Sequence, residues 1–195
     1  MALARRRRCR AHLRRPGLDE RQRLRGVHAG DPPVPLVVRP ATVDDIDAVL
    51  DVFEAVAAEG RWIATEVPFD RAERARRFEH TIAVRDDATL LVVVDDLTVV
   101  GQLFIEVAPY GVADLGMCIV VDYRGRGVGS ALMETAIGWA REHGAHKVAL
   151  QVWPHNEAGI ALYRKFGFEE EGHLQRHYRR KNGELWGAVI MGLAL

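Results

Sequence analysis

Two apolar segments flank a helix-like segment in the second half of the chain, and this arrangement restricts the fold more than any other feature. Residues 112–121 are mostly apolar and predict a buried strand. Residues 127–143 repeat apolar side chains on more than one helical face, which indicates a largely buried helix. Residues 148–153 predict a second buried strand. A strand–helix–strand crossover joins parallel strands, so these two strands should pair in parallel.

The rest of the chain predicts mostly antiparallel pairing, because its strands follow one another through short turns. The other predicted elements are, in chain order, a strand 36–39, a helix that begins after Thr42 and stops at Gly60, a helix 71–81, strands 89–94 and 98–107, a helix 158–166, and strands 168–174 and 185–193. We therefore predict an α/β fold. Its mixed, mostly antiparallel central sheet has about seven strands, with one parallel pair and helices on both faces.

Charge divides the chain near Pro35. Residues 1–35 contain ten arginines and three acidic residues, a net charge of +7, whereas residues 36–195 carry a net charge of −7. The first segment has too few apolar residues to bury a face. We interpret 1–35 as an Arg-rich, disordered tail and linker, and 36–195 as the folded domain. A nucleic-acid-binding arm and a transit peptide are the alternatives for the tail.

Several classes of protein are not indicated. No apolar run in the sequence approaches the roughly 18–20 residues that span a bilayer. The mildly acidic domain lacks the basic surface typical of nucleic-acid-binding proteins. Cys9 and Cys118 are the two cysteines, and the eight histidines show no ligand-like spacing, so we predict neither a disulfide framework nor a metal site. Without a secretory signal, we expect a cytoplasmic protein.

The turn between the first buried strand and the helix is rich in glycine and arginine. It reads Arg124-Gly125-Arg126-Gly127-Val128-Gly129-Ser130. Glycine lets the backbone approach a ligand closely, and the first N–H groups of the following helix form an anion site together with the helix dipole. This predicts a bound pyrophosphate. The turn has neither the lysine of a P-loop nor the spacing of a dinucleotide fingerprint. A turn that merely packs the helix on the strand is the alternative.

Two motifs resemble the GNAT superfamily of acyl-CoA-dependent N-acetyltransferases. Arg124-x-x-Gly127-x-Gly129 matches the superfamily signature Arg/Gln-x-x-Gly-x-Gly/Ala at the strand-to-helix turn. A second block matches downstream at Val152, Asn156, Ala158, Leu162, Tyr163, Gly167 and Phe168. The resemblance covers about residues 36–195, most strongly from residue 112 onward. It implies a GNAT-like fold, acetyl-CoA as co-substrate and N-acetyltransferase activity.

The resemblance also implies roles for individual residues. The strand residues expected in the cofactor site are Ile119, Val120 and Val121. Backbone groups of the first and last of these are expected to pair with the pantetheine arm of the cofactor. The amides from Arg124 to Ser130 are expected to hold the pyrophosphate, and Asn156 to contact the cofactor arm. Tyr163 is expected to lie near the sulfur and to protonate the departing thiolate.

Acetyl transfer to an amine also needs a route for the amine proton and a stabilised carbonyl oxygen. Asp114 is the first candidate for the base, acting directly or through water, and Glu106 on the neighbouring strand is the second. Backbone N–H groups near Cys118 and Ile119 are candidates to polarise the carbonyl. We expect no covalent acyl-enzyme at Cys118, because a small thiol within an apolar strand usually serves packing.

The acceptor site is the least constrained part of the prediction. In this fold the loop after the first helices covers the amine, and here that loop spans residues 59–69. Trp62 and Phe69 are expected to wall a pocket or to form a hydrophobic clasp, while Glu59 and Glu66 are expected to attract a cationic amine. Arginines near the last hairpin would instead favour an acceptor that bears a carboxylate: Arg176, Arg179 and Arg180.

We predict an N-acetyltransferase that moves an acetyl group from acetyl-CoA to a primary amine of a small molecule or an amino acid by direct attack. A protein N-terminal or lysine acetyltransferase is the first alternative, and it predicts an open groove. A non-catalytic acyl-CoA-binding module is the second, although Tyr163 and Asn156 argue against it. The exposed final strands are compatible with a homodimer.

Overall fold

The computed structural model describes residues 36–84 and 86–195. The predicted tail, residues 1–35, lies outside the described residues. The elements are, in chain order, β1 (Val37–Pro40), α1 (Ile46–Ala58), α2 (Arg71–Val84), β2 (Ala88–Asp95), β3 (Thr98–Val107), β4 (Val112–Ile119), α3 (Val128–Glu142), β5 (Lys147–Val152), α4 (Glu157–Lys165), β6 (Glu169–Arg179) and β7 (Leu185–Ala194). Short 3-10 turns at Val43–Asp45 and Val121–Tyr123 complete the set. The order of helices and strands is the predicted one.

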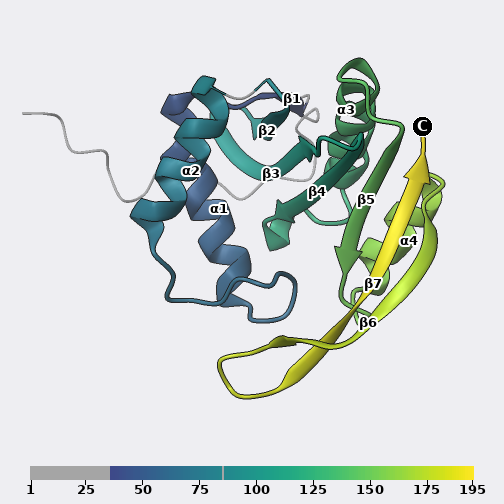
Figure 1. Ribbon diagram of the computed structural model, residues 1–195. Helices are drawn as coiled ribbons and strands as arrows, with labels where there is room; N and C mark the ends of the chain where they lie inside the picture. The colour runs from purple at the N-terminus through teal and green to yellow at the C-terminus, as the bar shows by residue number, and fades with distance from the viewer. Residues whose placement is uncertain (1–35, 85) are drawn as a thin grey trace, which may run out of the picture. The chain divides into compact units, whose positions relative to one another are not determined.

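The strands form one seven-stranded sheet in the order β1-β2-β3-β4-β5-β7-β6 (Figure 1). Among the described strands, β4 and β5 are the only parallel neighbours, and every other pair is antiparallel. The α3 helix makes the crossover between these two parallel strands. The predicted fold class, a mixed sheet with one parallel pair and helices on both faces, is confirmed.

Alternating side chains of β2 show how both faces of the sheet are covered. Leu90 and Val92 belong to an apolar cluster with side chains from α1 and α2. Their neighbours Leu91 and Val93 belong to a second cluster with side chains from α3 and α4. Successive side chains of a strand point to opposite faces. The helices α1 and α2 therefore lie on one face of the sheet, and α3 and α4 lie on the other.

Three helices begin at polar residues that accept hydrogen bonds from the chain. The Asp45 carboxylate, just before α1, accepts from the backbone N–H of Thr42 at 2.7 Å. The Asp70 carboxylate accepts from the N–H of Glu73 in the first turn of α2, at 2.8 Å. The side-chain oxygen of Asn156, before α4, accepts from the N–H of Gly159 at 3.0 Å. The last two bonds satisfy first-turn N–H groups of α2 and α4, which a helix start leaves without partners.

The parallel strands β4 and β5 separate soon after they meet. Residues Val112–Asp114 pair with Lys147–Ala149, and no further pair joins the two strands within the described residues. Beyond this point β4 continues its pairing with β3 as far as Ile119, and β5 continues with β7 as far as Val152. The two facing edges thus carry backbone groups that no neighbouring strand pairs. The predicted splaying of this pair is confirmed, and it opens the sheet beside α4.

The β4 strand ends two residues earlier than the predicted boundary at Val121. The chain instead turns at Val121–Tyr123, where the N–H of Tyr123 donates to the Val120 carbonyl and the N–H of Arg124 donates to the Val121 carbonyl. Side chains stabilise this turn, since the Tyr123 hydroxyl donates to Asp95 at 2.6 Å. The predicted boundary at Val121 was wrong because the segment is apolar throughout, and an apolar segment can form either a strand or a turn. The turn is decided by residues far away in sequence, such as Asp95.

The last hairpin is longer than predicted, because β6 extends to Arg179 rather than ending near Leu174. Its register with β7 shifts between Leu174 and Tyr178, and Arg176 has a positive φ of 52°. Such a bulge redirects the following side chains. Here Tyr178 turns its hydroxyl toward β5, where it donates to Gln151 at 2.5 Å.

Two global features bear on the predicted partners. Among the described helices, none is long and apolar enough to cross a membrane. The described residues also contain no group of three histidine, cysteine or acidic side chains arranged to hold a metal ion. The cytoplasmic location and the homodimer stay predictions.

Candidate active site

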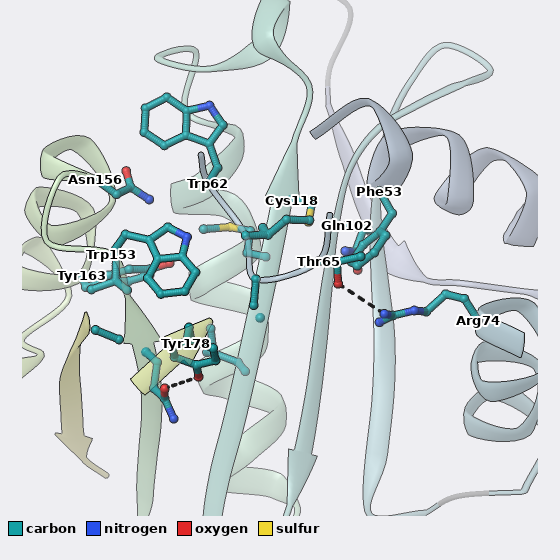
Figure 2. Close-up of a pocket in the computed structure, with 18 residues that line it drawn as sticks. Phe53, Trp62, Thr65, Arg74, Gln102, Cys118, Trp153, Asn156, Tyr163 and Tyr178 are labelled. Carbon is teal, nitrogen blue, oxygen red and sulfur yellow. Dashed lines mark hydrogen bonds between the residues drawn. The ribbon is translucent and has the colours of Figure 1, made fainter. Parts of the chain in front are cut away.

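Two cavities meet where β4 and β5 separate. The larger has a volume of about 620 Å³ and extends from β4 along the glycine-rich turn to α4. The smaller, about 290 Å³, lies between the loop after α1, β4 and the end of β5 (Figure 2). Five residues line both cavities: Trp62, Met117, Cys118, Asn156 and Tyr163. A group bound in one cavity can therefore reach a group bound in the other. We call the larger one the cofactor cavity and the smaller one the acceptor cavity.

The glycine-rich turn forms the far end of the cofactor cavity. Gly125 and Gly127 have positive φ values of 74° and 87°, which side chains disfavour. Gly127 is also the N-cap of α3, so the free N–H groups of the first helical turn follow it directly. A Cβ atom at Gly129 would lie 2.9 Å from a Leu162 methyl group. The turn thus provides an uncovered row of backbone N–H donors, as an anion site requires.

Cationic side chains at this turn have distinct surroundings. Arg124 donates through Nε to the Ile119 carbonyl at 2.9 Å and through its terminal nitrogens to Glu59. Its charge is therefore shared with a carboxylate. Lys165, in α4, lies across the cavity with Nζ 3.3 Å from the Ser130 hydroxyl. The sequence reasoning did not include Lys165, although it follows Tyr163 by two positions in the matched block.

The predicted cofactor residues fall into two groups. Those that line the cofactor cavity are Ile119, Arg124, Gly125, Gly127, Gly129, Ser130 and Asn156. Those that do not line it are Val120, Val121, Arg126 and Val128. Val121 lies in the 3-10 turn, and Val128 is 1% exposed within the core. The backbone edge suited to an extended ligand is therefore 117–119, two residues earlier in the chain than the predicted segment 119–121.

Tyr163 lies at the junction of the two cavities. Its side chain is 8% exposed, and burial raises the pKa of its phenol to about 12. It therefore remains protonated at any physiological pH and can donate a hydrogen bond or a proton. Asn156 caps α4 and so fixes the first turn of the helix that carries Tyr163. No hydrogen bond to the Tyr163 hydroxyl occurs within the described part of the chain, which leaves that hydroxyl available to a ligand.

The candidate bases Asp114 and Glu106 are neighbours. They are paired directly across β3 and β4. Burial, and secondarily the charge of Glu106, raises the pKa of Asp114 above its usual value. Neither carboxylate lines the acceptor cavity, but Asp114 shares a strand face with Gly116, which does. Two residues along a strand span roughly 7 Å. A proton would reach Asp114 from the cavity through water rather than by direct contact.

Cys118 is buried in β4, and burial raises the pKa of its thiol to about 12. A thiol in this state contains a negligible fraction of the nucleophilic thiolate at neutral pH. Gln102 lies opposite it on β3. The environment agrees with the expectation that Cys118 forms no acyl-enzyme.

A buried arginine holds the loop that covers the acceptor cavity. Arg180 is 3% exposed, and its guanidinium donates to the carbonyls of Gly60, Ile63 and Ala64. It also stacks over the Trp186 ring, 4.4 Å from the ring centre. Arg180 was one of three arginines considered for binding an acceptor carboxylate. Here it organises the loop, and none of the three lines the acceptor cavity.

Of the four predicted acceptor residues, Trp62 alone lines a described cavity. Glu59 accepts hydrogen bonds from Arg124 and from the Trp62 indole, and Arg124 lowers the pKa of its carboxyl. Glu66 accepts from the backbone N–H of Lys181 and pairs with Arg180. Phe69 packs edge-on against Phe53, with ring centres 5.5 Å apart, which is the clasp considered as its alternative.

Sequence reasoning missed several residues of the acceptor cavity, namely Arg74, Gln102, Gly116 and Trp153. They come from α2, β3, β4 and the end of β5. No motif connects them, and each one has an ordinary local environment in the sequence. Two of them have buried polar atoms without partners within the described residues, the side-chain oxygen of Gln102 and the indole nitrogen of Trp153.

Comparisons with known proteins agree with this geometry. The model of the acetyltransferase (GNAT) family matches residues 53–168. The L-amino acid N-acetyltransferase AaaT of Escherichia coli (strain K12) is 31% identical over 164 residues, which cover 80% of this chain and 96% of the relative.

Solved structures show the same architecture. The ribosomal-protein-alanine N-acetyltransferase of Brucella melitensis superposes with a TM-score of 0.75 at 28% identity, over 82% of this chain and 100% of that one. A GNAT superfamily phosphinothricin acetyltransferase of Sinorhizobium meliloti, solved in complex with acetyl-CoA, gives a TM-score of 0.73 at 20% identity over 82% and 88% of the two chains. At that identity the second likeness shows the fold alone.

The family match includes the glycine-rich turn, β4 and α4, and so covers the elements that build the cofactor cavity. Acetyl-CoA is bound in structures of homologues. The chain therefore belongs to the GNAT acetyltransferase family and is an acetyl-CoA-dependent N-acetyltransferase.

Proposed function

We propose that this enzyme transfers the acetyl group of acetyl-CoA directly to the amine of a small molecule of amino-acid size. The observation that carries the proposal is the acceptor cavity of about 290 Å³, which opens into the cofactor cavity at Tyr163. A volume of this size suits a compact acceptor better than a protein segment. The similarity to an L-amino acid acetyltransferase along almost its whole length supports the same class.

The cofactor cavity fits the parts of acetyl-CoA. The N–H groups that follow Gly127, together with Lys165, suit the pyrophosphate. The unpaired edge of β4 at 117–119 suits the amides of the pantetheine arm, which can pair with it like an added strand. When bound, the cofactor supplies an acetyl group activated as a thioester. These assignments place the reacting end of the arm beside Tyr163.

The side chains and backbone at the junction have separate tasks in the transfer. The acceptor cavity holds the amine against the carbonyl carbon, and positioning alone can contribute roughly 7–11 kcal/mol. Backbone N–H groups near Cys118 and Ile119 stabilise the carbonyl oxygen while the C–N bond forms. Tyr163 donates its proton to the sulfur as the C–S bond breaks. The proton that the amine loses passes through water toward Asp114.

Calorimetric titration of the full chain with acetyl-CoA, with NADH and ATP as controls, tests the cofactor assignment. We expect selective micromolar binding of acetyl-CoA. Release of free thiol from acetyl-CoA in the presence of L-amino acids, polyamines and peptides with free N-termini then tests the acceptor class. The proposal requires turnover with single amino acids or amines of similar size. Turnover with peptides alone would assign the enzyme to the protein-acetylating alternative, and binding without turnover of any amine would support the non-catalytic one.

A further inference from the structure

Arg74 is the one charged side chain that lines the acceptor cavity within the described residues. It extends from α2, and its Nη2 donates to the Thr65 hydroxyl at 3.3 Å (Figure 2). Its guanidinium lies 4.5 Å from the centre of the Phe53 ring. The described part of the chain provides no carboxylate within ion-pair distance of Arg74, in contrast to Arg71, which pairs with Asp51.

The state of Arg74 favours an anionic ligand. Burial lowers the pKa of its guanidinium below the usual value, because the charged form has lost part of its hydration. An arginine stays protonated at any physiological pH even so. A guanidinium that is partly desolvated, oriented by Thr65 and Phe53 and without an acidic partner gains most from a ligand carboxylate, which it can bind through two parallel hydrogen bonds.

Gln102 provides an independent second observation. Its side chain is 3% exposed, and its oxygen Oε1 has no hydrogen-bond partner in the described structure. A buried acceptor without a donor is unfavourable, so this oxygen gains from a ligand that donates a hydrogen bond to it. Figure 2 shows Gln102 beside Thr65, on the side of the cavity that Arg74 enters.

We propose that Arg74 and Gln102 form the binding site for the head group of an α-amino acid. The inference rests on the proposed function and specifies its acceptor. Arg74 binds the α-carboxylate, and Oε1 of Gln102 accepts an N–H of the α-amine. In an α-amino acid one carbon atom separates the amine from the carboxylate. A site for it therefore needs one group that binds the carboxylate and one that binds the amine, close together. Because Gln102 lies opposite Cys118 in the sheet register, only the width of β4 separates it from the strand edge proposed for the cofactor arm.

This site distinguishes free amino acids from protein N-termini. In a peptide the carbonyl next to the α-amine is a neutral amide, so Arg74 would remain without its anion. Binding such an acceptor would leave a partly buried charge uncompensated, which is costly. The proposed site therefore selects an acceptor whose α-carboxylate is free.

Matched substrates test the role of the carboxylate in the full-length enzyme. Thiol release is measured with L-leucine, L-methionine and L-glutamine, and with the α-amide of each. A hydrogen bond to a charged group contributes roughly 1.5–3 kcal/mol, so we expect kcat/KM for each acid to exceed that for its amide by about 10- to 100-fold. Equal kcat/KM values for acids and amides would overturn the proposal. This comparison uses the unmodified enzyme, so it does not depend on the stability of any variant.

Arg74→Gln is expected to raise KM for the acids by about 10- to 100-fold and to change kcat/KM for the amides by less than about threefold. Arg74→Lys should restore part of the preference, since it keeps the charge but not the paired donors. Arg77→Gln, on the same helix but outside the acceptor cavity, is the matched control and should leave the preference unchanged. Parallel losses for acids and amides in Arg74→Gln would contradict an interaction with the carboxylate.

Gln102→Leu tests the amine half of the site. Acids and amides both carry the α-amine, so this variant should reduce kcat/KM for both by a similar factor, about tenfold, with an unchanged Kd for acetyl-CoA. A weakened Kd for acetyl-CoA would show that Gln102 contacts the cofactor instead. If acetyl-CoA binds but no amine releases thiol, the proposed function fails. If amino acids react but the acid and its amide do so equally, the head-group site alone fails.

Discussion

The cofactor cavity and the acceptor cavity share a wall but are built in different ways. The cofactor cavity draws most of its lining from two continuous stretches, 117–130 and 156–165. The acceptor cavity takes between one and four residues from each of α1, α2, the loop between them, five strands or strand ends, and α4 with its N-cap. A site that binds through consecutive backbone groups can be recognised as a motif. A site that binds through side chains brought together by packing has no such motif.

The chemistry of the two ligands explains the contrast. A pyrophosphate and an extended arm need N–H donors and strand edges, which glycine placement and one splayed strand pair provide. An amine acceptor must be recognised by charge and hydrogen bonds at a few points, and different acceptors require different side chains. If the two cavities act separately, variants should change either cofactor binding or acceptor recognition, and the strongest change is expected at the glycine-rich turn.

Gly129→Trp should abolish binding of acetyl-CoA, raising its Kd by at least about 100-fold. A Cβ atom at this position would already lie 2.9 Å from Leu162, so a large side chain must occupy the cofactor cavity. Gly138→Trp is the control, because it lies on the same helix and a Cβ atom there would meet nothing within 4 Å. Calorimetry measures the effect. Micromolar binding by a folded Gly129→Trp would remove the glycine turn from the cofactor site.

Tyr163→Phe should lower kcat about 100-fold while the Kd for acetyl-CoA changes by less than about twofold, since general acids contribute 10²–10⁴-fold. Because burial raises the pKa of Tyr163 to about 12, the acid stays protonated and should cause no loss of activity below about pH 11. Tyr110→Phe, at a 71% exposed tyrosine, serves as the control. An unchanged kcat in Tyr163→Phe would exclude the acid role.

Gly116→Leu should reduce kcat/KM for the amine by at least about tenfold without changing the Kd for acetyl-CoA. Gly116 lines the acceptor cavity but not the cofactor cavity, and no atom lies within 4 Å of a Cβ placed there. The added side chain would therefore fill space that the acceptor needs. Gly138→Leu controls for a leucine introduced at an equally open glycine. A loss of acetyl-CoA binding in Gly116→Leu would show that the cavities do not act separately.

Asp114→Asn should lower kcat/KM by about tenfold or less at neutral pH, because water still accepts the proton. The pKa of Asp114 is raised, and the base acts only when ionised, so activity should fall as pH drops through a value above the usual range for aspartate. Asp114→Asn should remove this acidic limb of the pH–rate profile. Glu106→Gln should move the limb to lower pH, since it removes a negative neighbour. A limb that persists in Asp114→Asn would assign the proton acceptor elsewhere.

Glu59→Gln should have the smallest effect, and it tests the physical link between the two regions. The Arg124–Glu59 pair joins the glycine-rich turn to the loop that carries Trp62, and each side chain is 31% exposed. Such a pair contributes at most about 1 kcal/mol to stability. We expect a fall in Tm of a few degrees and a rise in KM for the acceptor of about two- to threefold. A larger change in the Kd for acetyl-CoA than in the acceptor KM would contradict this picture.

Much of the fold could be predicted because its signals are local. The strand–helix–strand pattern at 112–153 predicts the parallel pair, and short turns elsewhere predict antiparallel neighbours. The errors occur where distant residues decide an outcome. The β4 strand stops at Ile119 because Tyr123 and Arg124 find partners that lie far from them in sequence. The β6 strand continues through a bulge to Tyr178, which pairs with Gln151 on β5.

The same reasoning applies to the candidate site. Tyr163, Asn156 and most of the glycine turn line the cofactor cavity. A motif can indicate such residues, because it records residues that act from one continuous segment. Glu59 and Glu66 were predicted to attract an amine from their charge alone. The structure pairs them with Arg124, Arg180 and Lys181, and charge in a sequence does not show which partner neutralises it.

Local patterns along the chain were sufficient for the order of the elements, the parallel pair, the glycine-rich turn and the family, since each depends on neighbours in sequence. The side chains that surround the acceptor depend instead on tertiary packing. Arg74 and Gln102 enter one cavity because α2 packs on the face of the sheet to which Gln102 points. Burial then determines how strongly these two side chains can bind a ligand. Within the described residues the Arg74 guanidinium has no acidic partner and the Gln102 oxygen has no donor, and such groups bind a ligand strongly only where water cannot take its place.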